Sequence, residues 1–179
     1  MNITQFLDVV QSTGLAERIR NSLYLFPLIE SSHVIGLTMV FGTTAVMDMR
    51  LLGLASTHRS FRKVARDVVP WTWAAFGLTL ITGLLMFITN ATVYFHNTQF
   101  RLKMLAIALA GINMLVFEFT GGRTSDKWDD GKPPVSAKLA GVLSLLLWIS
   151  VVFFGRWIGF TTTANPTPAE DIQIPDIFK

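Results

Sequence analysis

The chain has no cysteine, and only 15% of its 179 residues are charged. The absence of cysteine excludes disulfides, thiolate metal sites, iron–sulfur clusters and cysteine nucleophiles. About a quarter of the residues in soluble domains are charged. Because so few charges leave much of a soluble surface uncovered, and because 51% of the residues are hydrophobic, the composition indicates a membrane protein.

The sequence also lacks the signals of nucleic-acid binding and of secretion. The Lys and Arg residues fall in short segments between apolar runs, so the net charge of +3 predicts no nucleic-acid binding. The N-terminus, MNITQFLDVV, lacks the cationic start and the small-residue cleavage site of a secretory signal. We therefore expect the first apolar span to be retained.

Four apolar runs are long enough to cross a bilayer, which takes about 20 helical residues. They cover residues 23–49, 68–95, 102–119 and 139–160. Ahead of them, apolar residues recur at helical spacing within residues 1–20, which predicts a short amphipathic helix on the membrane surface, with a frayed terminus as the alternative. The predicted fold is all-α: an integral membrane four-helix bundle (21–160) with this N-terminal interfacial helix and an extended periplasmic tail (161–179).

The direction of insertion follows from the basic residues. Nine Lys and Arg residues belong to the first and third loops, and six lie on the other side. Since cytoplasmic loops carry the excess of positive charge, we expect a bacterial inner-membrane protein whose two termini are periplasmic.

The segment LIESSHVIGL places Glu30 and His33 inside the first span. Ionisable residues in a span are costly, and they usually face the bundle interior and mark function. Glu30 lies on the same helix face as His33 at i, i+3, where it could accept a hydrogen bond from one ring nitrogen and leave the other for a metal. A relay of protons between the two side chains is a further possibility.

Counting residues from the span ends places other polar groups near the depth of His33. These are Asn113 and the segments 82–86 and 144–148, with a cationic outer mouth above them. The mouth contains Glu30, Arg101, Lys103 and Arg156. The functional hypothesis makes His33 a haem or copper ligand, or a proton-transfer group. The structural hypothesis has His33 bonded across helices to Asn113 or Ser144.

A second metal ligand is harder to assign. His96 lies near the outer end of the second span, and an interfacial histidine is the alternative interpretation. Methionine is a known haem and copper(I) ligand, which makes Met86 a candidate. Arg101 or Arg156 would lie near the propionates of a haem. No hydrolase or kinase motif is present, so we predict no catalytic residue.

Several segments resemble a family of small bacterial inner-membrane proteins of unassigned function. They are LFPLIESSH, MDMRLLG, VVPWTWAAFGLTLITGLLMF, NTQFRLKMLAIALAGINMLVFE and SLLLWISVVFFGRWIGF, and the resemblance covers most of residues 15–160. More distantly, the four-helix plan with an early histidine is similar to copper-resistance D membrane proteins and to cytochrome b-type electron carriers. Those proteins carry additional histidines.

The leading functional prediction is a small inner-membrane subunit with a cofactor or metal site around His33 near the periplasmic side. Haem b in electron transfer is the first choice, and copper handling is the alternative cofactor chemistry. A non-catalytic accessory subunit of a larger membrane complex is the alternative from another class. The expected partners are the lipid bilayer and a membrane or periplasmic protein, with a redox protein as one candidate. A homodimer would bring a second His33, or the His96 of a neighbour, to the site.

Overall fold

Four long helices dominate the computed structural model, which describes residues 2–56, 58–122 and 133–163. They are α3 (Leu25–Leu52), α4 (Phe61–Thr89), α6 (Thr98–Phe117) and α7 (Val135–Thr163). Each is long and apolar enough to cross a membrane, and the described residues contain no strand. The predicted all-α four-helix bundle is therefore confirmed.

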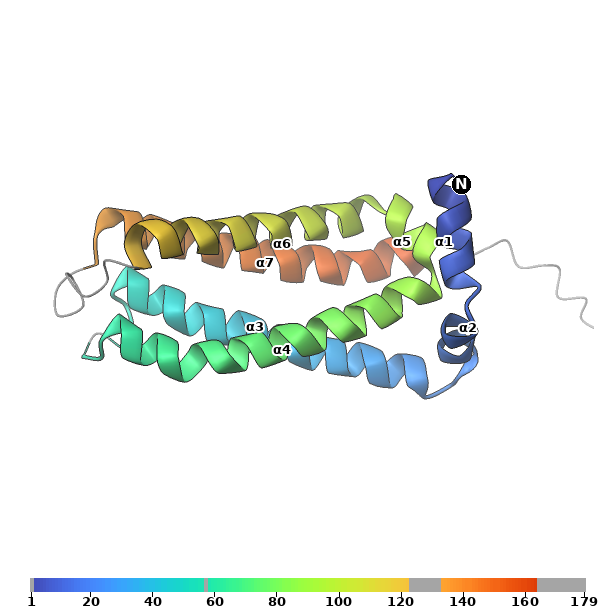
Figure 1. The fold of residues 1–179 in the computed structure, drawn as a ribbon, viewed down its shortest axis with the longest axis horizontal. Coiled ribbons are helices and arrows are strands. Elements are labelled where there is room, and N and C mark those ends of the chain that lie inside the picture. Colours follow the sequence, from blue (N-terminus) through green and yellow to red (C-terminus); the bar gives the residue numbers. More distant parts are fainter. Residues whose placement is uncertain (1, 57, 123–132, 164–179) are drawn as a thin grey trace, which may run out of the picture.

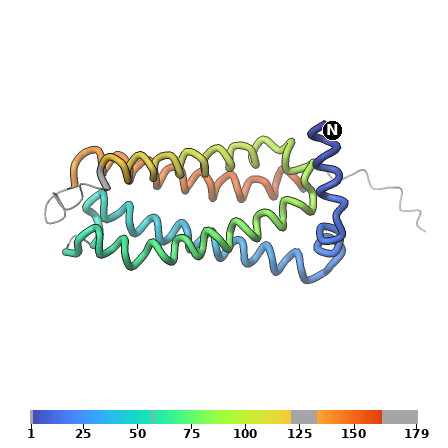
Figure 2. Tube along the Cα trace, viewed as in Figure 1, coloured from blue at the N-terminus to red at the C-terminus, as the bar shows by residue number. Residues whose placement is uncertain are grey.

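The four helices form two pairs. Helix α3 packs along α4, α6 packs along α7, and the pairs meet mainly through α3 and α7. Figure 1 shows the two pairs, and the tube in Figure 2 follows the chain through them. The backbones of α4 and α6 lie further apart, and aromatic side chains bridge them at both ends, Phe61 with Phe117 and Phe87 with Phe100. The bundle is therefore closed on one side by α3 and α7 and loosely closed on the other.

Glycines set how closely the paired helices approach. Gly36 of α3 faces Thr79 of α4, and Gly141 of α7 faces the backbone of Asp48 in α3. A Cβ atom would lie 2.5 Å from Thr79 Oγ1 at the first position and 3.2 Å from Asp48 O at the second. Small residues allow this approach in membrane bundles, where packing replaces the hydrophobic effect between helices.

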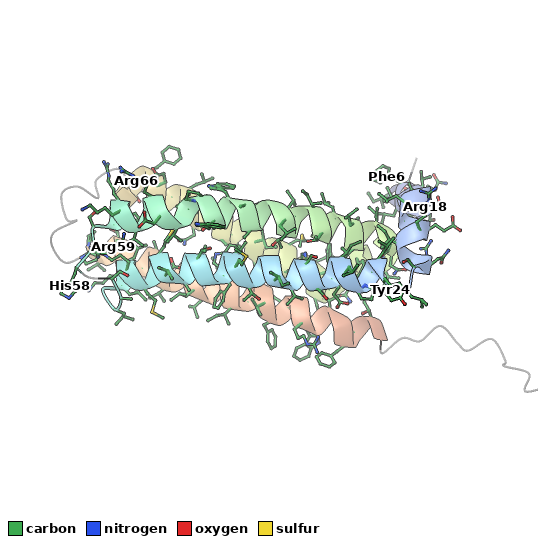
Figure 3. The ribbon with its side chains drawn as sticks, turned by 90° about the horizontal axis from the view of Figure 1, so that it is seen from below. Phe6, Arg18, Tyr24, His58, Arg59 and Arg66 are labelled. Atoms are coloured by element: carbon green, nitrogen blue, oxygen red, sulfur yellow. The ribbon has the colours of Figure 1, made fainter. Side chains whose placement is uncertain are left out.

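Two short helices lie across one end of the bundle (Figures 1 and 3). They are α1 (Ile3–Gln11) and α2 (Gly14–Asn21), in the part of the chain where the sequence predicted one short amphipathic helix. Arg20 Nη1 donates to Thr89 O at 2.7 Å, and Thr92 Oγ1 donates to Asp8 Oδ1 at 3.1 Å. These bonds hold both short helices to the end of α4 and to the helix that follows it.

The predicted second span, 68–95, corresponds to two helices. Helix α4 ends at Thr89, and α5 (Ala91–His96) follows after Asn90, which has an extended φ of −147°. The Asn97 side chain then accepts hydrogen bonds from the backbone N–H groups of Gln99 and Phe100, which begins α6 at residue 98 instead of 102. Helix α6 continues into a short π-helix, η1 (Glu118–Gly122).

Candidate functional site

His33 lies on α3 with its ring turned towards α4. Its Nδ1 is 3.1 Å from Thr82 Oγ1. The Thr82 hydroxyl donates its proton to Leu78 O, at 2.7 Å, so its oxygen accepts from His33 Nδ1–H. This bond fixes the tautomer and leaves the lone pair of His33 on Nε2.

Lys103 of α6 completes the group. Its Nζ lies 3.5 Å from His33 Nε2, at the outer limit of a hydrogen bond. Among the described residues, no carboxylate oxygen lies within 4.0 Å of the Lys103 ammonium. We call His33, Thr82 and Lys103 the His33 cluster. It joins three helices and pairs a nitrogen lone pair with a cation that has no carboxylate beside it.

Two glycines border the cluster. A Cβ at Gly83 of α4 would lie 3.0 Å from His33 Cε1, and a Cβ at Gly155 of α7 would lie 3.5 Å from Lys103 Nζ. The first distance is tighter than most Cβ contacts, so the glycine allows the imidazole to lie against α4. The second is an ordinary van der Waals distance, so α7 borders the lysine without constraining it.

The other predicted cofactor residues lie around the cluster's end of the bundle without entering it. Glu30 is exposed, and the nitrogens of His33 face Thr82 and Lys103 rather than the carboxylate. Arg101 and Arg156 are exposed as well, and the Arg156 guanidinium lies 5.5 Å from the centroid of the Phe160 ring.

The predicted metal ligands other than His33 are also apart from the cluster. His96 is exposed on α5, where its Nδ1 lies 2.9 Å from Thr92 O. Met86 is half-buried on α4, one turn beyond Thr82. Within the described ranges, no group of three or more His, Asp or Glu side chains could hold a metal ion.

An aromatic group closes the same end of the bundle. The ring of Tyr94 in α5 lies 6.4 Å from that of Phe87 and 5.9 Å from that of Phe100, centroid to centroid. Burial raises the pKa of the Tyr94 phenol, and the negative charge of Glu30 raises it further. The charge of Glu30 therefore affects the pKa of Tyr94, a residue that the sequence analysis did not connect with it.

Asn113 and Ser144 belong to another part of the bundle. Asn113 Nδ2 donates to Ala140 O at 3.0 Å, and Ser144 hydrogen-bonds the buried carboxyl group of Asp48. The expected bond from His33 to Asn113 or Ser144 is therefore absent. The depths estimated from the predicted span ends were wrong, because α6 begins four residues earlier than predicted and α7 ends three residues later. At 1.5 Å per residue, both polar groups move by about 5 Å away from His33.

Sequence reasoning found His33 and the segment of Thr82, and it placed Lys103 in the outer mouth. The four-carbon stem of lysine lets its charge lie well away from its own backbone. Asp48 was noted only as part of the MDMRLLG motif. A carboxylate near the end of a span, three residues before a leucine pair, gives no signal that it is buried.

The comparisons with known proteins agree with the fold and give no activity. No curated protein and no solved structure matches the chain, so the comparisons give no support for the expected similarity to copper-resistance D proteins or cytochrome b carriers. A family model described as "Family of unknown function (DUF6644)" matches residues 16–161, which include all four spans and the His33 cluster. The chain is therefore a member of the family of unknown function DUF6644.

Proposed function

We propose that the His33 cluster is the cofactor site of a small membrane electron-transfer subunit, with haem b as the cofactor. The supporting observation is the pairing of His33 Nε2, a lone pair of fixed tautomer, with the Lys103 ammonium, which has no carboxylate beside it among the described residues. A histidine nitrogen would hold the haem iron and a cation would pair with a haem carboxylate, and these two side chains offer one of each.

The donor set fits this cofactor in a defined way. His33 would bind through Nε2, and Thr82 would hold the ring through Nδ1, as hydrogen-bonded partners do for metal-binding histidines. Lys103 would turn from Nε2 to a propionate, and the exposed Arg101 or Arg156 would meet the other. Bound haem supplies one-electron transfer, and the protein fixes its position and its electrostatic surroundings.

The proposal includes the place of the protein in the cell. The basic residues Arg59, Arg62, Lys63 and Arg66 follow α3 or lie in the first turns of α4, at the end of the bundle opposite α1 and α2 (Figure 3, which labels Arg59 and Arg66). With this end in the cytoplasm, the chain lies in the bacterial inner membrane, both termini are periplasmic, and the His33 cluster opens towards a periplasmic or membrane redox partner.

An absorption spectrum of the natively expressed, detergent-purified protein tests the cofactor. We expect sharp reduced bands of haem b that are lost in His33→Ala and retained in His96→Ala, a control with the same substitution at an exposed position. Lys103→Met should keep the bands and lower the midpoint potential, because a cation beside haem favours the reduced state. A folded protein without visible absorption would refute haem, and elemental analysis would then show whether copper is bound.

A second candidate is an accessory subunit in which the cluster only fixes helix packing. This candidate is favoured because hydrogen-bond contacts link side chains of three helices, namely His33, Thr82 and Lys103. In this case His33→Ala should lower the stability to unfolding, or weaken binding to the larger complex, in a protein that has no cofactor. His96→Ala should change neither property.

A further inference from the structure

Asp48 is a buried acid with an unused hydrogen-bonding oxygen. It lies on α3 near the end opposite His33, and 5% of its surface is exposed. Ser144 of α7 hydrogen-bonds its carboxyl group, while Oδ2 has no partner among the described residues. The nearest arginine in the chain, Arg50, directs its Nε to Arg59 O at 2.8 Å. An unsatisfied carboxylate oxygen is costly in an apolar interior unless something binds it.

The packing around Asp48 is fixed on one side. Gly141 of α7 lies against the Asp48 backbone, where a Cβ would be 3.2 Å from Asp48 O and 3.3 Å from Leu51 Cβ. This approach brings Ser144, one turn further along α7, to the carboxyl group. The carboxyl group is therefore held in place by α7.

A cavity of about 270 Å³ lies beside this carboxyl group, with walls from α3, α4, α6 and α7. Its lining is almost entirely apolar, and Asp48 is the only charged residue in it. Five of the lining side chains are aromatic: Phe61, Trp73, Phe76, Phe117 and Trp148. The backbones of α4 and α6 are not closely packed, so a ligand dissolved in the bilayer reaches the cavity between these helices by displacing side chains such as Phe61 and Phe117.

We propose that this cavity binds a small lipophilic amine in its protonated form, with the ammonium paired with the carboxylate of Asp48, whose side chain turns to bring the covered Oδ2 to the ligand. An ammonium offers the N–H donors that the free oxygen lacks, and the aromatic walls attract a cation as well as an apolar body. The bound ion pair has no net charge, which suits a site within hydrocarbon. The volume is near the lower end for ligand pockets, which selects an amine with one small ring. This inference is independent of the His33 cluster.

The test uses 4-bromophenethylamine with the full-length protein in nanodiscs. Its bromine quenches tryptophan on contact, and Trp73 and Trp148 line the cavity. We expect saturable quenching by the amine and only weak, unsaturable quenching by 4-bromophenethyl alcohol, which has the same ring without the charge. Asp48→Asn should weaken amine binding at least tenfold. Asp67→Asn, at an exposed aspartate of α4, should bind the amine as the unmodified protein does.

A second variant protects the test against a change in folding. Gly111 lines the cavity, and a Cβ there meets no atom within 4 Å. The side chain of Gly111→Leu should therefore start in open space and reduce the cavity volume, and this variant should abolish saturable quenching while Asp48 is intact. Equal binding of amine and alcohol, or binding that persists in Asp48→Asn, would overturn the proposal in favour of a neutral lipid chain in the cavity. No saturable quenching would overturn it outright.

Discussion

The contact between Gly36 and Thr79 gives the sharpest prediction about stability. Gly36 is buried on α3, and an alanine Cβ there would lie 2.5 Å from Thr79 Oγ1 and 3.4 Å from Ala75 O. The Thr79 hydroxyl donates to that same Ala75 carbonyl at 2.8 Å. The hydroxyl therefore cannot move aside without losing its hydrogen bond, and Gly36→Ala must push α3 and α4 apart.

The expected size follows from two opposing effects. Overpacking a close contact costs about 1–3 kcal/mol, and alanine in place of glycine favours a helix by about 1 kcal/mol. Gly42→Ala is the matched control, because Gly42 is on the same helix and a Cβ there meets no atom within 4 Å. Gly42→Ala receives only the favourable effect, so the two variants should differ in the free energy of unfolding by about 1–3 kcal/mol.

Unfolding by sodium dodecyl sulfate in mixed micelles, followed by far-ultraviolet circular dichroism, measures this difference. Thr79→Ala removes the hydroxyl that the new methyl group meets, so Gly36→Ala should cost less in that background. A coupling energy of about 1 kcal/mol would be typical of residues in contact. Equal stabilities of Gly36→Ala and Gly42→Ala, or the same cost with and without Thr79, would refute the reasoning.

Two further predictions concern the end of the bundle near α1 and α2. In a Tyr24→Phe protein, Tyr94 is the only remaining tyrosine, and its tyrosinate absorbance should appear with a midpoint above 10.0, because burial and then the Glu30 charge raise its pKa. When folding raises the pKa of a phenol, the phenol contributes its full stabilisation below pH 10. This contribution is lost as the pH rises through the folded-state pKa. The Tyr94→Phe protein should therefore lose less stability at alkaline pH than the unmodified protein. Gly83→Ala should displace the imidazole of His33 by a few tenths of an ångström and shift its nitrogen resonances in a magnetic resonance spectrum, and an unchanged spectrum would contradict the close contact at Gly83.

The fold was predictable because it depends on long signals. Four runs of about 20 apolar residues give the same result whatever the exact helix ends, and the structure has helices at each of them. The break after α4 was not predicted, because Asn90 and Asn97 occur within a run whose hydropathy continues through Val93 and Phe95. A single capping side chain decides where α6 begins, and such a signal is weaker than an apolar run.

The candidate site was predictable only in part for the same reason. His33 was conspicuous as an ionisable residue in an apolar helix, but its partners depend on helix ends and on side-chain length. A change of three or four residues in the ends of α6 and α7 moved Asn113 and Ser144 away from the histidine. The reach of Lys103 brought its charge to the imidazole instead.

The wider spacing of α4 and α6 explains why the two polar side chains of α3, His33 and Asp48, are held by different kinds of contact. Intramembrane ionisable groups must face other helices, and α3 packs closely on α4 and α7 but not on α6. The Asp48 carboxyl group is met by α7 at close range, because Gly141 admits the backbone of α3. The His33 Nε2 faces α6, which is too far away for a short side chain, and only the length of Lys103 crosses the gap. A ligand at His33 Nε2 therefore has to displace Lys103, whereas a ligand at Asp48 has to pass the aromatic side chains between α4 and α6 and leaves both close helix pairs undisturbed.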